Sequence, residues 1–337
     1  MIHGTLSIRM AGNVATEKML QKSVDALTSL VDNLGRVIVG KKEFLEYTVT
    51  TLAAGGHLLI EDVPGLGKTT AAKTLASLVS SGSGDGRVRF SRIQFTPDLL
   101  PYDITGVDVF NPESGRFSFK PGPVFANILL ADEINRTSPK VQSALLEVMA
   151  ENQVTVGNKT HAMDPFFFVV ATQNPVDIEG TYPLPLAQVD RFMMRLSIGY
   201  PDLEAEFEII SGDPSRNVMP NIKPVCGKRD ILRVRESVQS VYCDPKLIRL
   251  ITELGVLTRD HGGVHLGVSP RGSLMLLQAS RALALVRKRD YVVDQDVIDL
   301  APRVLAHRLK LKEPGLDGEK LIREAALGVL EHIDYAT

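Results

Sequence analysis

The chain has 337 residues, of which 44% are apolar and 23% charged, and its formal net charge is −2. This composition is typical of a globular protein with room for two domains and a sizeable core. The near-neutral charge gives no general reason to expect a nucleic acid or an anionic membrane as partner. No stretch is long and apolar enough to span a membrane, and Met1 to Leu20 lack the apolar segment of a secretion signal, so we expect a cytoplasmic protein. The spacing of Cys226 and Cys243 predicts free thiols.

Residues 16–34 carry apolar side chains at helical spacing, and we assign residues 1–34 to an N-terminal helical extension. An apolar turn, Val37 to Gly40, follows this helix. Because the turn lies just upstream of a candidate phosphate loop, Val39 and Gly40 are candidates to line an adenine pocket. Plain packing of the turn between two helices remains the alternative.

The stretch from Leu58 to Thr70 predicts a buried strand and a glycine-rich turn closed by Lys68 and Thr69, and a helix from Thr69 to Val79 should follow. In such a loop the backbone N–H groups surround the phosphates, the lysine adds positive charge and the Thr69 hydroxyl is placed for Mg²⁺. Asp62 stands at the position of the usual first glycine, where we expect a left-handed backbone and a negative charge near the phosphates. A glycine-rich turn before an ordinary helix is the alternative. The candidate nucleotide-binding residues are Val39, Gly40, Pro64, Gly65, Leu66, Gly67, Lys68, Thr69 and Thr70.

A second apolar strand, Asn127 to Ala131, ends in Asp132 and Glu133. The carboxyl ends of parallel strands meet at one edge of a sheet, so this pair should lie beside the phosphate loop. We expect Asp132, together with Thr69, to hold Mg²⁺, and Glu133 to orient and deprotonate the attacking water. An acidic pair that merely ends a strand at the surface is the alternative.

Two further segments predict hairpins. Residues 96–122 break into Pro, Gly and Asp with short apolar pieces, which favours a hairpin insert that projects from the body. Residues 153–164 contain two short strands flanking Gly157 and Asn158, a two-residue turn. A buried strand then leads to Asn174, a candidate to hold the lytic water, although an asparagine before proline also favours a plain turn.

After a last core strand, Phe192 to Ile198, the pattern predicts only helices. Their approximate ranges are 202–212, 229–240, 244–259, 270–288 and 294–309. Arg271 falls in the first turn of the fourth of these helices, where the helix dipole disfavours a cation. A nearby anion would compensate, and a surface salt bridge is the alternative.

Taken together, these parts resemble the AAA+ ATPases, and within them the MoxR family, over about residues 35–310. The segments that carry the resemblance are Glu61 to Thr69, Arg92 to Pro101, Lys120 to Asn127, Ala131 to Arg136, Ala171 to Pro175, Asp190 to Phe192 and Ser269 to Arg271. The resemblance implies a P-loop αβα sandwich with a five-stranded parallel sheet at 35–200 and a helical lid at 201–337. It also implies ATP and Mg²⁺ as ligands, a ring that is usually a hexamer, and chaperone-like remodelling or maturation of a protein partner or metalloenzyme complex, often with a von Willebrand A domain protein.

The same resemblance puts the end of the core near Arg191 at a subunit boundary. Arg191 would then be an arginine finger for the neighbouring subunit's nucleotide, and a surface pair with Asp190 is the alternative. Arg271 would read the γ-phosphate of its own or a neighbouring subunit. Leu186 departs from the family pattern, which commonly has Glu before Ala-Gln, so a polar contact at the interface is in question.

Three other functions were weighed against this one. A GTPase is excluded because the chain's Asn158-Lys159 is not followed by the aspartate that guanine recognition needs. A helicase like the MCM proteins would carry several basic residues on its hairpins, where Arg116, Lys120 and Lys159 are sparse. An ATP-gated scaffold without turnover remains open at this stage.

Overall fold

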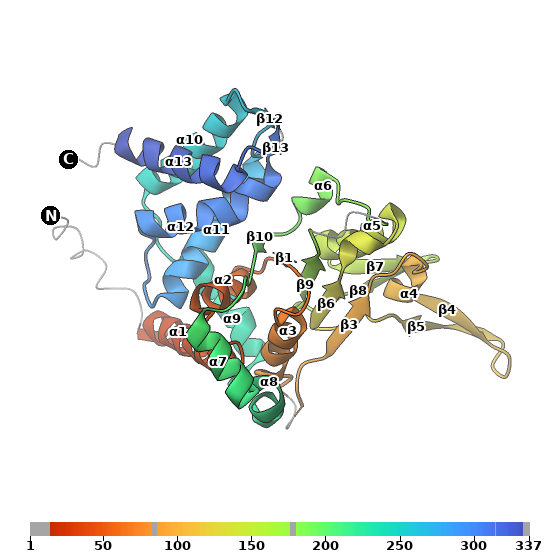
Figure 1. Cartoon of the computed structure of the whole chain (residues 1–337). Coiled ribbons are helices and arrows are strands. Elements are labelled where there is room, and N and C mark those ends of the chain that lie inside the picture. Colours follow the sequence, from red (N-terminus) through yellow and green to blue (C-terminus); the bar gives the residue numbers. More distant parts are fainter. Residues whose placement is uncertain (1–13, 83–85, 176–179, 314, 333–337) are drawn as a thin grey trace.

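The structure is a computed structural model, and it describes residues 14–82, 86–175, 180–313 and 315–332 of the chain. Figure 1 shows a sheet flanked by helices on the right of the view and a group of helices at the left and top. Residues 1–13 of the expected N-terminal extension and 333–337 of the expected lid lie outside the described residues. No helix in the described part of the chain is long and apolar enough to cross a membrane.

Five parallel strands form the central sheet, in the order β10-β1-β9-β6-β3. Their bounds are β1 Leu58–Glu61, β3 Phe90–Gln94, β6 Ile128–Asp132, β9 Phe168–Gln173 and β10 Met194–Leu196. Every residue of β6 is buried, because helices cover both faces of the sheet. This is why the inner strands read as continuous apolar runs. The predicted five-stranded parallel sheet is confirmed, and its carboxyl ends share one edge.

Alternate strand residues point into two different hydrophobic clusters, one on each face of the sheet. The first cluster contains Leu58 and Ile60 of β1 together with residues of α1 (Val14–Gly35), α2 (Lys42–Ala53) and α3 (Lys68–Ser77). The second contains Leu59 together with residues of α4 (Pro101–Thr105), α5 (Pro139–Glu151) and, at its margin, α6 (Leu186–Val189). The strand alternation therefore builds the expected αβα sandwich.

A hairpin lies in each of the two segments where the sequence indicates one. The strands β4 (Gly106–Asn111) and β5 (Arg116–Pro121) pair antiparallel and project from the sheet in Figure 1. Gly106 and Gly122 close the base of this hairpin, where a Cβ on Gly122 would lie 2.2 Å from the carbonyl oxygen of Ile104. The strands β7 (Gln153–Val156) and β8 (Lys159–Ala162) form the second hairpin.

The chain beyond β10 is mostly helical, as predicted. Its helices are α7 Leu203–Gly212, α8 Pro214–Asn217, α9 Lys228–Ser240, α10 Pro245–Asp260, α11 Pro270–Val286, α12 Asp294–Leu305 and α13 Gly318–His332, with short 3₁₀ turns at 219–221 and 306–308. A further 3₁₀ turn, at 134–136, follows β6 in the core. The sequence analysis missed α13. Its expectation of helices alone was also wrong, since β12 (Val264–Leu266) pairs with β13 (Lys310–Leu311).

A further short pairing corrects the predicted extent of the phosphate-loop helix. We expected that helix to reach Val79, but α3 ends at Ser77. Residues Val79–Ser80 instead form β2, which pairs in parallel with β11 (Cys226–Gly227). The two cysteines are free and buried, as predicted.

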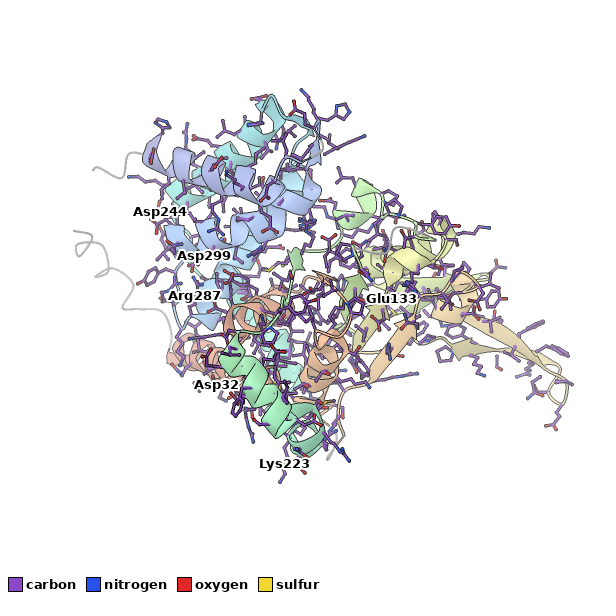
Figure 2. All side chains as sticks on the ribbon, viewed as in Figure 1. Asp32, Glu133, Lys223, Asp244, Arg287 and Asp299 are labelled. Atoms are coloured by element: carbon purple, nitrogen blue, oxygen red, sulfur yellow. The ribbon has the colours of Figure 1, made fainter. Side chains whose placement is uncertain are left out.

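The first hydrophobic cluster is shared by the core and the C-terminal helices. It runs without a break from α1, α2 and α3 into α9 to α13. A buried hydrogen bond joins Ser23 of α1 to Ser237 of α9, with 2.9 Å between the hydroxyl oxygens. Arg287, which directly follows α11 and is labelled in Figure 2, bridges Glu46 of α2 at 3.1 Å and Asp299 of α12 at 2.9 Å. These contacts fix the C-terminal helices on the core.

Candidate nucleotide-binding site

The glycine-rich turn between β1 and α3 forms an open cradle. Gly65 and Gly67 have φ angles of 88° and 86°, which a residue with a Cβ rarely adopts. No side chain caps the start of α3. The first N–H groups of this helix are therefore left to bind an anion, and the helix dipole favours a negative charge there.

Lys68 extends beneath the cradle. Its Nζ donates to the carbonyl oxygens of Asp62 at 2.6 Å and of Val63 at 3.2 Å. Burial lowers the pKa of Lys68, and the nearby carboxylates of Asp62, Asp132 and Glu133 act in the opposite direction. The ammonium group is thus positioned between the loop and the acidic strand end.

The structure corrects both expectations for Asp62. Its backbone is not among the left-handed residues of the described chain, and its side chain turns away from the cradle. The Oδ2 atom accepts hydrogen bonds from the backbone N–H groups of Ile198 at 2.6 Å and Gly199 at 2.8 Å, and from the Ser197 hydroxyl at 3.0 Å. With 7% of its surface exposed, Asp62 anchors the loop to the chain after β10. The charge that we expected beside the phosphates is held by backbone donors instead.

Asp132 lies at the end of β6 with both carboxylate oxygens engaged. Oδ1 accepts a hydrogen bond from the Thr172 hydroxyl at 2.7 Å. Oδ2 accepts two from Arg92, from Nε at 3.1 Å and from Nη2 at 2.6 Å. These bonds orient the carboxylate toward the phosphate cradle, and a metal ion bound there would share it with Arg92.

Glu133 is held in a left-handed conformation, with φ of 58°. Its backbone N–H donates to the Thr172 hydroxyl at 2.8 Å, and its carboxylate accepts from Gln94 Nε2 at 2.8 Å. The Glu133 carboxylate also forms an ion pair with Arg136, with 3.3 Å between Oε2 and Nε. A strained backbone held by its neighbours is typical of functional sites. Figure 2 labels Glu133 beside the strand ends.

One cavity of about 380 Å³ joins the cradle to the acidic strand end. Nine of the sequence-derived candidates line it: Pro64, Gly65, Gly67, Lys68, Thr69, Thr70, Asp132, Glu133 and Asn174. Asn174 is buried and follows β9. Leu66, by contrast, packs against the first hydrophobic cluster. The cavity therefore collects phosphate-binding, metal-binding and water-activating groups on one side of the sheet.

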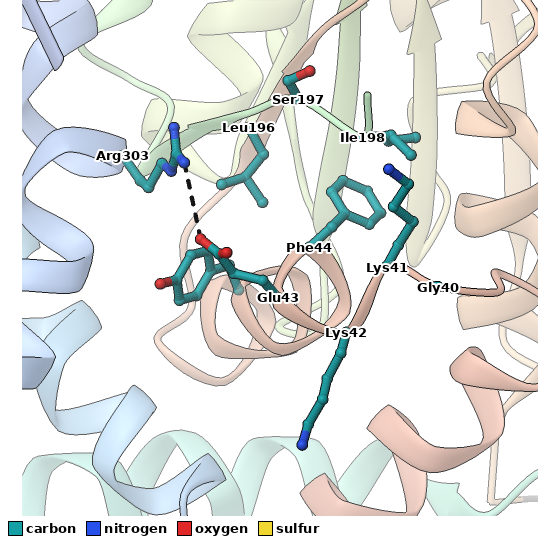
Figure 3. Close-up of a pocket in the computed structure, with 10 residues that line it drawn as sticks. Gly40, Lys41, Lys42, Glu43, Phe44, Leu196, Ser197, Ile198 and Arg303 are labelled. Carbon is teal, nitrogen blue, oxygen red and sulfur yellow. Dashed lines mark ion pairs between the residues drawn. The ribbon is translucent and has the colours of Figure 1, made fainter. Parts of the chain in front are cut away.

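Val39 and Gly40 do not line this cavity, although their turn touches the cradle. A Cβ on Gly67 would meet the Ile38 Cδ1 atom at 3.8 Å. Gly40 instead lines a second cavity of about 270 Å³, shown in Figure 3, between the start of α2, the end of β10 and Arg303 of α12. Gly40 has φ of 72°, and a Cβ there would lie 2.5 Å from Ala205 of α7. The turn thus connects the phosphate loop to α7.

Arg191 also lies outside the phosphate cavity. Its Nη1 donates to the carbonyl oxygen of Leu146 at 2.6 Å. The alternative pairing with Asp190 is replaced by an ion pair between Asp190 and Arg308 at 2.8 Å. Arg308 is buried, which lowers its pKa to about 10, and Asp190 acts in the opposite direction.

Arg271 is exposed in the first turn of α11 and is likewise absent from the phosphate cavity. A Cβ on its neighbour Gly272 would lie 2.9 Å from Arg308 Cδ. Since Arg308 also binds Asp190, it holds the first turn of α11 beside the segment that carries Arg191. Arg308 thus contacts the neighbours in sequence of both candidate arginines, and neither Arg191 nor Arg271 lines the phosphate cavity of its own chain.

Comparison with known proteins places this arrangement in a family. Residues 57–194 match the family of ATPases associated with various cellular activities, and residues 256–326 match the AAA lid domain. The chain is 42% identical to Chaperone MoxR1 of Mycobacterium tuberculosis over 89% of this chain and 80% of that protein. The chain belongs to the MoxR family of AAA+ ATPases.

Two further comparisons agree with membership of the MoxR family. YeaC of Bacillus subtilis, an uncharacterised protein, is 46% identical over 88% of this chain and 92% of its own length. A solved structure of a protein from Cytophaga hutchinsonii, described as an ATPase, has a TM-score of 0.85 and 37% identity, covering 96% of this chain and 98% of that one. The fold and the family assignment therefore extend over nearly the whole chain.

In this MoxR-family site, three polar residues were missed by the sequence analysis. Arg92 and Gln94 lie on β3, and Thr172 lies on β9; all three contact the acidic pair of β6. Arg92 and Gln94 alternate along β3, which the sequence shows, but only the strand order of the structure places β3 beside β6 and makes Gln94 the register partner of Asp132. Leu186, the departure from the family pattern, begins α6.

The residues present fit a nucleotide with a divalent metal. Among the described residues, no group of three or more His, Cys, Asp or Glu side chains could hold a metal ion by itself. Thr69 and Asp132 line the same cavity as the cradle. A hard cation there would take these two oxygen ligands and complete its shell from phosphate oxygens and water.

Proposed function

We propose that this chain is a Mg²⁺-dependent ATPase that acts as a homo-oligomeric ring, a hexamer by family resemblance, in the cytoplasm. The single observation that carries the proposal is the cavity in which the phosphate cradle, Lys68, Thr69, Asp132 and Glu133 meet. From the family resemblance we propose further that the ring remodels or matures a protein partner or metalloenzyme complex, together with a von Willebrand A domain protein. The name of the relative Chaperone MoxR1 supports the chaperone-like part of this proposal.

The proposal assigns one role to each candidate residue that the sequence analysis placed in this site. The cradle amides and Lys68 bind the phosphates, and Thr69 and Asp132 hold Mg²⁺, which offsets charge on the phosphoryl group. Glu133 takes a proton from the attacking water, and Asn174 orients that water. The chemistry is the hydrolysis of ATP to ADP and phosphate.

Arg191 and Arg271 complete the site of a neighbouring subunit. Neither lines its own phosphate cavity, and Arg308 contacts the neighbours in sequence of both. A guanidinium brought from another subunit meets the charge that develops on the transferred phosphoryl group. On this ground we propose that Arg271 serves the nucleotide of the neighbouring subunit and not that of its own.

Two variants test this proposal by separating ATP binding from ATP hydrolysis. Lys68→Ala should lose ATP binding, because the charge beneath the cradle is gone. Glu133→Gln should keep ATP binding and lose hydrolysis, because only the step that activates water is affected. Nucleotide binding by fluorescence and phosphate release measure the two steps. Near wild-type turnover by Glu133→Gln would refute the role assigned to Glu133.

Mixing experiments test the roles in a neighbouring subunit. Arg191→Ala should bind ATP and hydrolyse it roughly 10³-fold more slowly or worse, which is the size of effect that arginine fingers have. Mixed with Glu133→Gln subunits, it should regain activity, because a mixed interface pairs an intact Glu133 with an intact Arg191. Arg271→Ala should also slow hydrolysis and weaken the preference for ATP over ADP. Concentration-independent hydrolysis by a monomer would refute a finger that acts between subunits.

A further inference from the structure

The helix α7 exposes an apolar stripe that nothing in the described chain covers. Its only buried residue is Ala205. Leu203, Phe207 and Ile210 are 78%, 73% and 76% exposed. These three positions share one face of the helix, about half a turn away from Ala205. The stripe therefore faces away from the side on which Ala205 packs against the rest of the chain, and Figure 1 shows α7 at the outside of the molecule.

Exposure on this scale indicates a docking surface. Scattered apolar side chains are normal on a protein surface, but a contiguous stripe on one helix marks an interaction site. Tyr200, just before α7, is 76% exposed and extends the patch. A helix of ten residues is also marginal without packing on its apolar side.

The stripe is flanked by acids. Glu204 and Glu206 lie on either side of it, Glu208 follows, and α7 has no basic residue. The surface that covers α7 should therefore combine exposed apolar side chains with cations. This charge pattern argues against an anionic membrane and for a protein partner.

Exposed apolar and cationic residues of that kind occur in the same chain, at the β12–β13 pair and the first turns of α11. We define the lid patch as Leu266, Arg271, Leu274, Lys310 and Lys312. Leu266 and Leu274 are 54% and 55% exposed, and Lys310 is the strand partner of Leu266 in the β12–β13 pair. Its three cations outweigh Glu313, the acid that follows Lys312.

Position connects the two surfaces. The segment leading into α7 is bound to the phosphate loop through Asp62, and Ala205 lies against Gly40. The lid patch contains Arg271, which the proposed function brings to the phosphates of a neighbouring subunit. In the ring, the face of one subunit that carries Arg271 would therefore lie beside α7 of the neighbouring subunit.

We propose that α7 docks onto the lid patch of a second copy of this chain, with its apolar stripe against Leu266 and Leu274 and its glutamates facing Lys310 and Lys312. This inference rests on the ring of the proposed function and names the contact that positions Arg271. The contact couples assembly to the nucleotide site, because α7 lies directly after the backbone that holds Asp62.

A charge swap tests the contact. Glu204→Lys with Glu206→Lys reverses the α7 surface, and Lys310→Glu with Lys312→Glu reverses the lid patch. Each double variant alone should assemble roughly tenfold more weakly or worse, because like charges then face one another. An equimolar mixture of the two should recover assembly, since alternating subunits pair reversed with reversed and native with native surfaces. Sedimentation velocity with a non-hydrolysable ATP analogue measures the assembly.

A matched control uses the other exposed apolar surface with two cations, the β4–β5 hairpin. Arg116→Glu with Lys120→Glu should neither weaken assembly to the same degree nor restore the reversed α7 variant. Phe207→Glu gives a second test of the stripe, and the circular dichroism spectrum of each variant reports folding. Folded α7 variants that assemble like wild type, or rescue by the hairpin variant in place of the lid variant, would overturn the proposal.

Failure of this contact can be told from failure of the ring. If Arg191→Ala and Glu133→Gln subunits restore hydrolysis together while the reversed α7 assembles normally, the ring stands and this contact is wrong. If the charge swap restores assembly while the mixed Arg191 and Glu133 variants stay inactive, the contact stands and the roles assigned to those two residues are wrong.

Discussion

Substitution of Asp62 distinguishes two roles for its carboxylate. In the structure the carboxylate anchors the phosphate loop, whereas its place in the family's loop pattern predicts a negative charge beside the phosphates. Asp62→Gly restores the usual glycine of the phosphate loop but removes the acceptor of the hydrogen bonds from Ile198, Gly199 and Ser197, and of a local one from the Val63 N–H. The Ile198 N–H is buried, so water cannot replace the lost partner there, whereas Gly199 and Ser197 are reached by water. A buried donor left without a partner costs about 1–3 kcal/mol, and the weaker replacement of the other two bonds adds about 1 kcal/mol.

We therefore expect Asp62→Gly to lose about 2–4 kcal/mol of unfolding free energy and to lower the melting temperature by about 3–6 °C. Nucleotide affinity should change by less than about threefold, because the carboxylate faces backbone donors rather than phosphates. Calorimetry and equilibrium binding of ATP measure the two quantities. The matched control Glu113→Gly removes an exposed acid from the β4–β5 turn and should change stability by less than about 0.5 kcal/mol.

The opposite result would refute the orientation of Asp62. If the carboxylate faced the phosphates, its removal would relieve repulsion of the nucleotide. Asp62→Gly would then bind ATP many times more tightly at an unchanged melting temperature. Asp62→Asn distinguishes charge from hydrogen bonding, since an amide oxygen still accepts from the Ile198 N–H and should keep part of the stability.

Three other predictions follow from the geometry. Gln94→Ala should raise hydrolysis about fivefold by releasing the Glu133 carboxylate from a hydrogen bond worth about 1 kcal/mol; a fall in the steady-state rate would mean that Gln94 holds Glu133 productively. The pKa of His57 is lowered from 6.5 to about 4 by burial, so folding should be insensitive to this group above pH 6.5 and lose about 1.4 kcal/mol per pH unit between 6.5 and 4; in urea titrations, the difference in unfolding free energy between wild type and His57→Gln should change with pH only in that window. Gly40→Ala should lose about 1–3 kcal/mol, because its Cβ would lie 2.5 Å from Ala205 at a positive φ, and an unchanged urea midpoint would show that α7 can move away at no cost.

Much of the core was predictable from the sequence because its signals are local. A strand buried on both faces must be a continuous apolar run, and the runs around Leu59, Leu129 and Val169 are of this kind. The phosphate loop is likewise set by the positive φ angles that Gly65 and Gly67 adopt. In both cases, a few neighbouring residues carry the whole physical requirement.

The features that the sequence did not predict depend on distant segments. The orientation of Asp62 is decided by backbone donors 136 and 137 residues later in the chain. The early end of α3 is decided by the pairing of Val79 with Cys226. Gln94 becomes part of the site only because β3 lies next to β6. Each of these outcomes follows from strand order, which local periodicity does not specify.

The missed helix α13 has a different cause. Its apolar positions Ile322, Ala326 and Val329 are spaced as a helix requires, and Asp317 accepts hydrogen bonds from the backbone N–H groups at its start. The signal was therefore local and could have been found. Its burial against the other C-terminal helices explains why the family's lid model extends to residue 326.

The unbroken hydrophobic cluster that links α1 to α13 limits how this protein can be divided or rebuilt. A fragment ending near residue 200 would leave the apolar sides of α1 and α2 without the side chains of α9 and α11 that bury them. Grafting the C-terminal helices of another family member would leave mismatched side chains in the same interior. Because one hydrophobic cluster joins the core to these helices, the native chain should melt in a single cooperative transition. Exchange of parts between relatives therefore has to include α1 along with α9 to α13, although more than two hundred residues separate Ser23 from Ser237.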